Sequence, residues 1–245
     1  MTDPNSFKVK IFADGADLAS MKAIYENPLV KGFTTNPTLM RNAGVDDYKA
    51  FAHEVLAAIP DRPVSFEVFA DVFDEMEIQA REIASWGANV NVKIPVTNTK
   101  GEFTGPLLTR LGQAGVAVNV TAVFTLDQVD RIAGALSPDV PAIVSVFAGR
   151  AADTGIDPVP LMTEAVNILR PLPKAELLWA SPREVLNIFQ ADACGCHIIT
   201  VTNDILKKLS LAGKDQTEYS LETVQMFYRD ASAAGYDIET SKAAE

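Results

Sequence analysis

Residues 89–97 read NVNVKIPVT, and this short stretch alternates apolar and polar side chains. Because successive side chains of a β-strand point to opposite faces, Val90, Val92 and Ile94 share one face, and Asn91 and Lys93 share the other. The question is whether the polar face meets water or an enclosed space. A lysine that is shielded from water can act as a nucleophile. The fold around this strand therefore decides whether Lys93 has a chemical role.

The same kind of short β-branched run recurs along the chain and alternates with longer amphipathic runs. Strands are expected at residues 9–14, 31–36, 64–69, 89–94, 116–121, 142–147, 176–181 and 197–202. Strands that alternate with helices, without a Pro/Gly/Ser-rich linker, predict parallel βαβ units. Eight such units in 245 residues predict an α/β protein with a single (β/α)8 TIM barrel domain over residues 1–245.

A doubly wound open sheet is the alternative, but it has less support. No Gly-x-Gly-x-x-Gly follows the first expected strand, and no phosphate-loop motif is present. After the eighth strand, residues 217–236 predict an additional C-terminal helix with Leu221, Val224 and Tyr228 on one stripe. Residues 240–245 are expected to be a frayed tail.

Composition and charge narrow the classes of partner and the location. The net charge of −11 and the pI of about 4.7 argue against a nucleic acid or an anionic membrane surface as partner. An anionic substrate stays possible, because a site can be locally basic. No apolar run approaches the roughly 18 residues of a membrane span, and the first ten residues lack the pattern of a signal peptide. A cytoplasmic location is therefore expected.

When the period of two is applied to every expected strand, one face is apolar and the opposite face carries polar side chains. The polar set is Asp14, Thr34, Asn36, Ser65, Glu67, Asn91, Lys93, Asn119, Thr121, Ser145 and Ser181. These residues concentrate toward the carboxyl ends of the strands, where barrel enzymes place their chemistry. A single buried polar residue, such as Asn91 one layer deeper, is more often structural. A lysine and two carboxylates in one interior are costly to bury without a purpose, and they predict an active site around Lys93.

The residue types favour Schiff-base chemistry. A neutral lysine condenses with a ketone, and the positive nitrogen of the product acts as an electron sink for carbon–carbon cleavage. Glu67 and Asp14 are available as proton carriers. A metal-dependent lyase is the alternative, but it normally needs several histidines, and the chain has only His53 and His197. No metal is expected.

Two arginines follow adjacent expected strands. Arg150 ends the segment SVFAGR, and Arg183 ends WASPR. Together with the Ser181 hydroxyl, they predict a clamp that holds a phosphate by charge-assisted hydrogen bonds.

Five segments carry a resemblance to a known family. They are GFTTNPT (32–38), VKIPVT (92–97), NVTAVF (119–124), SVFAGR (145–150) and WASPR (179–183). In this order and spacing, the chain resembles the transaldolases. Its size resembles that of the small single-barrel members, which include the bacterial fructose-6-phosphate aldolases.

The resemblance implies a class I Schiff-base mechanism without a metal or an organic cofactor. It implies that Lys93 forms the Schiff base, that Glu67 acts through a water also held by Thr121, and that Asp14 takes the proton of the C4 hydroxyl. The positions that match substrate-binding residues are Thr34, Asn36, Asn119 and Ser145, and those that match the phosphate-binding set are Arg150, Ser181 and Arg183.

Two further positions distinguish the branches of the family. The aldolase branch has glutamine in place of Glu67 and tyrosine in place of Phe147, which also lines the expected substrate site. Glutamate and phenylalanine are the transaldolase choices and favour transfer over simple cleavage. Pro182 and Gly15 depart from the family pattern, so the phosphate clamp and the first loop are expected to be reshaped.

The leading hypothesis is therefore a transaldolase that moves a dihydroxyacetone unit between sugar phosphates in carbohydrate metabolism. An aldolase that releases free dihydroxyacetone is the first alternative, and a non-catalytic barrel that binds sugar phosphates is the second. Small members of the family assemble as rings through the terminal helix, typically decamers. The resemblance thus implies a homo-oligomer.

Overall fold

The computed structural model describes residues 7–238 of the 245-residue chain. The chain divides into two compact units, one that ends at Leu209 and one that begins at Ser210. The first unit carries all of the strands found in the described residues. The expected tail at 240–245 lies outside the described residues.

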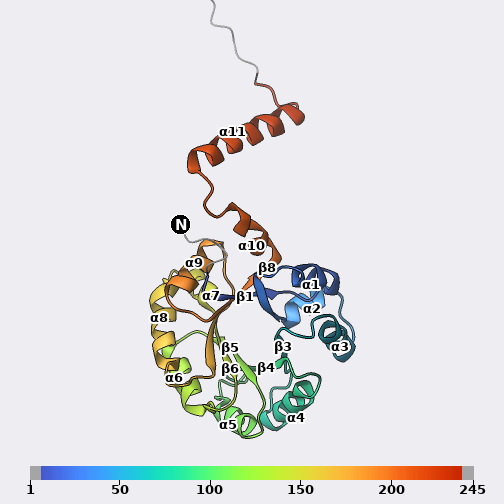
Figure 1. The fold of residues 1–245 in the computed structure, drawn as a ribbon, viewed down its shortest axis with the longest axis vertical. Helices are drawn as coiled ribbons and strands as arrows, with labels where there is room; N and C mark the ends of the chain where they lie inside the picture. The colour runs from blue at the N-terminus through green and yellow to red at the C-terminus, as the bar shows by residue number, and fades with distance from the viewer. Residues whose placement is uncertain (1–6, 239–245) are drawn as a thin grey trace, which may run out of the picture. The chain divides into compact units, whose positions relative to one another are not determined.

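The strands of the first unit form a closed parallel barrel in the order of the sequence (Figure 1). They are β1 Lys10–Asp14, β2 Val30–Thr34, β3 Val64–Glu67, β4 Val90–Pro95, β5 Val118–Val123, β6 Ala142–Val146, β7 Ala175–Trp179 and β8 Ile198–Thr202. β8 pairs with β1 and closes the ring. The predicted (β/α)8 barrel is confirmed, and its register sets Lys93 beside both Glu67 and Asn119.

Helices follow the strands and surround the barrel (Figure 1). In the first unit they are α1 Leu18–Tyr25, α2 Pro37–Asn42, α3 Tyr48–Ala58, α4 Phe73–Ala84, α5 Gly105–Gln113, α6 Leu126–Ala135, α7 Ala148–Asp153, α8 Pro158–Leu169, α9 Leu186–Ala193 and α10 Asn203–Lys208. Local chemistry sets where they begin. Thr125, for example, opens α6 with a reciprocal capping box in which Gln128 takes part.

The two faces of the strands differ as the alternation predicts. The residues that pack against the helices are apolar and fully buried, as Phe66, Val92 and Val144 show. Inside the barrel, Phe12 belongs to an apolar cluster with Ile143, Leu178, Ala180 and Ile198. The Phe12 ring lies 2.5 Å from where a Cβ on Gly32 would stand, so only glycine fits opposite it. Apolar packing thus fills part of the interior and leaves the polar groups at the carboxyl ends of the strands.

Three site residues do not lie on strands, contrary to the bounds that the alternation predicts: Asn36, Phe147 and Ser181. β6 ends at Val146, and Phe147 is the N-cap of α7. β2 ends at Thr34, and Asn36 is instead the N-cap of α2, where its side chain accepts a hydrogen bond from the Leu39 amide at 3.0 Å. β7 ends at Trp179, and the prediction that Ser181 is an inward residue of this strand is wrong. Ser181 has a φ of +57°, so the backbone turns after Ala180 and brings its side chain to the cavity described below.

The second unit contains α11, Gln216–Ala233, which confirms the predicted C-terminal helix. The Asp215 side chain caps it by accepting from the amides of Thr217 and Glu218. No residue of α11 is buried. Among the described residues, no helix combines the length and the apolar content needed to cross a membrane.

Candidate active site

A cavity of about 480 Å³ opens at the carboxyl ends of the strands. Its lining contains nearly every residue that the sequence predicts for the site: Asp14, Thr34, Asn36, Glu67, Lys93, Asn119, Thr121, Ser145, Phe147, Arg150 and Ser181. These residues come from strands β1 to β6 and from the segments that follow β2, β6 and β7. The structure therefore brings together side chains that lie far apart in the sequence.

Lys93 and Glu67 form an ion pair at the centre of the cavity. The Lys93 Nζ donates to Glu67 Oε2 at 3.0 Å and to the carbonyl oxygen of Thr35 at 2.7 Å. The two side chains are only 9% and 17% exposed. A buried amine beside a carboxylate has a partner that can accept its proton, which is the first requirement of an amine nucleophile.

Asp14 is a third ionisable group in the same cavity. Burial raises the pKa of its carboxyl above the ordinary value, although the charge of Lys93 and a hydrogen bond from Thr34 oppose the rise. Thr34 Oγ1 donates to Oδ1 at 2.8 Å, and Asn36 Nδ2 approaches Oδ2 at 3.4 Å. A carboxyl that is oriented on both oxygens and has a raised pKa is suited to proton transfer.

Hydrogen bonds between buried hydroxyl and amide groups hold the other polar residues. Ser145 Oγ donates to Asn119 Oδ1 at 2.6 Å, and Asn119 Nδ2 donates to Ser65 Oγ at 3.1 Å. Thr34 and Thr200 share a further hydrogen bond of 2.6 Å between their hydroxyls. Sequence reasoning placed Ser65 in the inward polar set without giving it a role in the site, and it left Thr200 out. The alternation in β8 was the available signal for Thr200, since it pairs in register with the inward residue Phe12.

At the mouth of the cavity, the side chain of Arg150 stacks near an aromatic ring. The Arg150 guanidinium lies 5.1 Å from the centre of the Phe147 ring, which in turn packs against Phe124. Phe147 thus orients Arg150 by a cation–π contact. The arginine is exposed and able to meet an anionic group of a ligand.

The segments that follow β6 and β7 touch so closely that one position must be glycine. A Cβ on Gly149, in α7, would lie 1.5 Å from the Ser181 carbonyl oxygen. The Gly149 amide donates to the Ala180 carbonyl at 3.2 Å. Because Arg150 and Ser181 adjoin this contact, Gly149 fixes the spacing of the two groups predicted to bind phosphate.

Arg183, the third residue predicted to bind phosphate, does not lie with Arg150 and Ser181 in the structure. Its side chain is exposed and pairs with Asp153, with Nε 2.9 Å from Oδ1, and it is not among the residues that line the cavity. The Arg183 guanidinium holds the pKa of the Asp153 carboxyl below its usual value. Of the three residues predicted to bind phosphate, only Arg150 and Ser181 therefore line the cavity.

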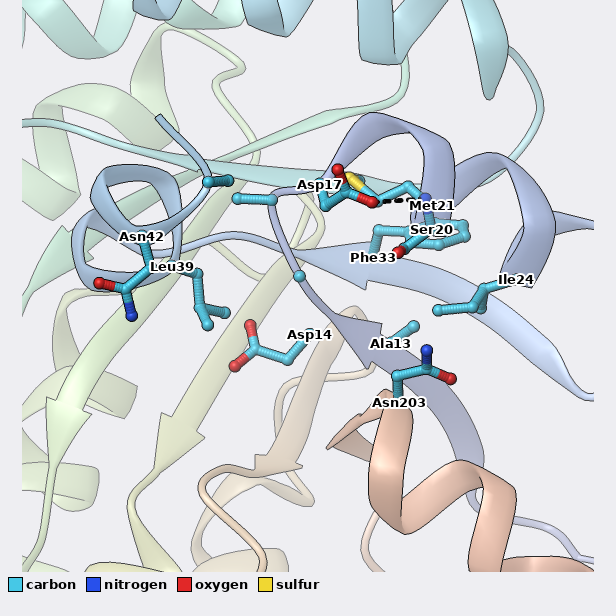
Figure 2. A pocket seen from close by; sticks show the side chains of 13 residues that line it. Ala13, Asp14, Asp17, Ser20, Met21, Ile24, Phe33, Leu39, Asn42 and Asn203 are labelled. Carbon is cyan, nitrogen blue, oxygen red and sulfur yellow. Dashed lines mark hydrogen bonds between the residues drawn. The ribbon is translucent and has the colours of Figure 1, made fainter. Parts of the chain in front are cut away.

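Figure 2 shows the side chains that line a second cavity, of about 290 Å³. The two cavities share Asp14 and Leu39. Most of the other residues around the second cavity come from the continuous segment 13–24, which runs from β1 through the following loop into α1, and Asn203 is added from the start of α10. Asp14 therefore stands where the two cavities meet.

The histidines and cysteines lie outside the lining of the large cavity. His197 Nδ1 accepts from the Leu177 amide at 3.0 Å, and His53 packs near the Trp86 ring. Burial raises the pKa of both the Cys194 and the Cys196 thiol, so these thiols are poor nucleophiles. Within residues 7–238, His, Cys, Asp and Glu form no group of three or more that could hold a metal ion.

Known structures share this fold at low sequence identity. An HpcH/HpaI aldolase/citrate lyase family protein from Burkholderia cenocepacia superposes with a TM-score of 0.59 at 17% identity, over 89% of this chain and 95% of the other. A 2,3-dimethylmalate lyase of the PEP mutase/isocitrate lyase superfamily gives 0.54 at 12% identity, over 98% and 89% of the two chains. At these identities the likeness concerns the fold alone.

Sequence comparisons are more specific. A protein of Dehalococcoides mccartyi named "Probable transaldolase" is 36% identical over 202 residues, which cover 82% of this chain and 90% of the relative. A protein of the same name from Streptococcus agalactiae is 34% identical over 203 residues, or 82% and 89% of the two chains. The profile of the transaldolase/fructose-6-phosphate aldolase family matches residues 11–244. The chain therefore belongs to the transaldolase/fructose-6-phosphate aldolase family.

Proposed function

We propose that this protein is a transaldolase that transfers a dihydroxyacetone unit between sugar phosphates through a Schiff base on Lys93. The contact of Lys93 with Glu67 at 3.0 Å, in a cavity that also holds Asp14, carries the proposal. Membership of the family and the names of the curated relatives support it. The proposed reaction uses side chains of the cavity and one water molecule.

The first half of the reaction forms the covalent intermediate. Lys93 gives a proton to Glu67, and its neutral Nζ attacks the ketone carbon of the donor sugar. The carbonyl oxygen takes up a proton to give a carbinolamine, which then loses water and becomes an iminium ion. Glu67 delivers the proton for the loss of water through a water molecule held together with Thr121, which lines the same cavity.

The second half breaks and remakes a carbon–carbon bond. Asp14 takes the proton of the C4 hydroxyl, the bond between the third and fourth carbons breaks, and its electron pair moves to the iminium nitrogen. The aldehyde leaves, and a three-carbon enamine stays bound to Lys93. An acceptor aldehyde then reverses these steps, with Asp14 returning its proton to the new hydroxyl, and water finally releases the ketose.

Substrate binding follows from the remaining residues of the cavity. Thr34, Asn36, Asn119 and Ser145 offer hydroxyl and amide groups to the sugar hydroxyls. Arg150 and Ser181 receive the phosphate at the mouth. Arg183 reaches the phosphate only by giving up Asp153, so its part in the clamp depends on exchange of one anion for another.

Reductive trapping tests the covalent step. The protein is treated with borohydride in the presence of fructose 6-phosphate, digested and examined by peptide mass analysis. A dihydroxyacetone-derived adduct is expected on Lys93 and not on Lys10, a half-buried lysine paired with Glu176. A protein that turns over the sugar without any adduct on Lys93 contradicts the mechanism.

Release of free dihydroxyacetone is the second candidate activity, because the matching family profile includes fructose-6-phosphate aldolases. Glu67 and Phe147 favour transfer, since the aldolase branch has glutamine and tyrosine there. Donor cleavage is therefore measured with and without erythrose 4-phosphate. Turnover that does not depend on the acceptor favours the aldolase, and turnover that requires it favours transfer.

We also propose that the protein acts in the cytoplasm as a homo-oligomer. Both cysteines are free, which suits a reducing compartment. In α11, the side chains of Leu221, Val224 and Tyr228 are 58%, 60% and 76% exposed. They follow one another at helical spacing and offer an apolar stripe to a second copy of the chain.

A further inference from the structure

Strand β3 extends beyond the point where its neighbour β2 ends. The two strands pair at Thr34 and Ser65, and the last backbone bond between them runs from the Thr35 amide to the Ser65 carbonyl at 3.3 Å. The chain then leaves the sheet and enters α2. In a parallel strand, alternate residues bond to the same neighbour, so the backbone of Glu67 points toward the place that β2 has vacated.

The phenol of Tyr48 occupies the hydrogen-bonding position of the missing strand. The Glu67 amide donates to Tyr48 Oη at 2.6 Å, and Tyr48 Oη donates to the Glu67 carbonyl oxygen at 3.0 Å. A hydroxyl has one proton to donate and lone pairs that accept, so one atom satisfies both backbone groups. Tyr48 thereby satisfies the backbone groups at the end of β3 that a neighbouring strand would otherwise pair with.

Several contacts hold the phenol in place. Tyr48 is the first residue of α3, and the Asp47 side chain caps that helix by accepting from the Ala50 amide. The Tyr48 ring packs against Phe69 and Trp86, with ring centres 4.8 Å and 5.5 Å away. Burial raises the pKa of the Tyr48 phenol above its usual value, so the hydroxyl keeps its proton at neutral pH.

We infer that Tyr48 is a positioning residue that acts through Glu67, and this inference rests on the proposed function. The hydroxyl fixes the peptide from which the Glu67 carboxylate reaches Lys93 Nζ. Phenylalanine at position 48 keeps the ring but leaves the Glu67 amide and carbonyl without these partners. The carboxylate then loses its fixed distance to the amine.

The test compares two substitutions that each remove one phenol hydroxyl. Tyr48→Phe removes the two hydrogen bonds between the Tyr48 hydroxyl and the backbone of Glu67. Tyr25→Phe is the matched control, because the Tyr25 hydroxyl donates to Asp61 at 2.6 Å and the residue is not part of the large cavity. The measurements are the melting temperature, kcat and KM with fructose 6-phosphate and erythrose 4-phosphate, and the single-turnover rate of borohydride trapping.

For Tyr48→Phe, kcat and the trapping rate are expected to fall roughly 10- to 100-fold while KM changes little, since loss of orientation affects the chemical step. Tyr25→Phe is expected to match the wild type. If the wild-type protein forms no adduct on Lys93, the proposed function fails and the inference fails with it. Wild-type trapping together with an unchanged rate for Tyr48→Phe overturns the inference alone.

A double-mutant cycle separates positioning from a general loss of structure. Glu67→Ala removes the side chain through which Tyr48 acts, so adding Tyr48→Phe to Glu67→Ala is expected to cause no further loss of kcat. Independent, multiplicative losses in the double variant overturn the inference, because a structural defect acts whether or not Glu67 is present.

Discussion

Gly149→Ala is expected to damage the proposed phosphate-binding side of the cavity. The added Cβ would stand 1.5 Å from the Ser181 carbonyl oxygen, whereas real Cβ contacts essentially never fall below 3.0 Å. The difference, 3.0 − 1.5, means that the two segments must separate by at least about 1.5 Å. Both sides of the contact are backbone, and Ser181 already has a φ of +57°, so neither side yields by simple rotation of a side chain.

The size of the effect follows from this displacement. Forcing additional atoms into a packed region costs about 1–3 kcal/mol of folding stability. A misplacement of about 1 Å in a binding group lowers the rate by roughly 100-fold when that group orients the substrate. With fructose 6-phosphate, kcat/KM of Gly149→Ala is therefore expected to fall roughly 100-fold. Free dihydroxyacetone carries no phosphate, so borohydride trapping of Lys93 with this compound is expected to stay near the wild-type rate.

Gly134→Ala supplies the control. Gly134 lies in α6, and a Cβ there meets nothing within 4 Å, so the substitution is expected to leave activity unchanged and to stabilise the helix by up to about 1 kcal/mol. Melting curves and steady-state kinetics of both variants check the comparison. If Gly149→Ala melts like the wild type and uses fructose 6-phosphate equally well, the contact between α7 and Ser181 does not set the geometry of the site.

Three further predictions concern other parts of the molecule. The pKa of Asp14 is raised in the folded protein. Between the ordinary pKa and the raised one, the folded protein therefore binds more protons than the unfolded chain, and its free energy of unfolding falls as pH increases. Asp14→Asn is therefore expected to abolish transfer yet flatten this part of the dependence of melting temperature on pH; an unchanged slope contradicts the assignment. Asp153→Asn releases Arg183 and is expected to tighten competitive inhibition by inorganic phosphate several-fold, and an unaltered inhibition constant excludes Arg183 from the clamp. Leu221→Asp on α11 is expected to reduce the assembly to smaller species in light scattering, and an unaltered mass speaks against the apolar stripe as the interface.

The sequence predicted the interior of the barrel well because period-two alternation is a property of the strands themselves. Asn119, Thr121 and Ser145 all lie on strands, and all line the cavity as the alternation requires. The same reasoning failed at Ser181, which follows the end of β7 and reaches the cavity through a left-handed turn. Alternation carries no information once the chain leaves the sheet.

Hydrogen-bond partners that come from other loops could not be predicted from the sequence, for a different reason. Arg183 was expected at the phosphate because it follows a strand end, but Asp153, at the end of α7, captures its guanidinium. Likewise, nothing in the helix that begins with Tyr48 indicates that its hydroxyl closes β3. Such contacts depend on where two loops meet in space, and local patterns do not encode that meeting.

The segment Thr34–Asn36 explains how Lys93, the proposed nucleophile, and Asp14, the proposed base, keep a fixed relation. Thr34 and Asn36 both contact the Asp14 carboxylate through their side chains, and between them the Thr35 carbonyl accepts a hydrogen bond from Lys93 Nζ. The Thr35 amide and hydroxyl both donate to the Ser65 carbonyl, which anchors the segment to β3. One short segment thus holds Asp14 with its side chains and Lys93 with its backbone, so a movement of either group is opposed by the other. This arrangement preorganises both side chains before a substrate arrives, which is the property that the proposed Schiff-base mechanism needs from its scaffold.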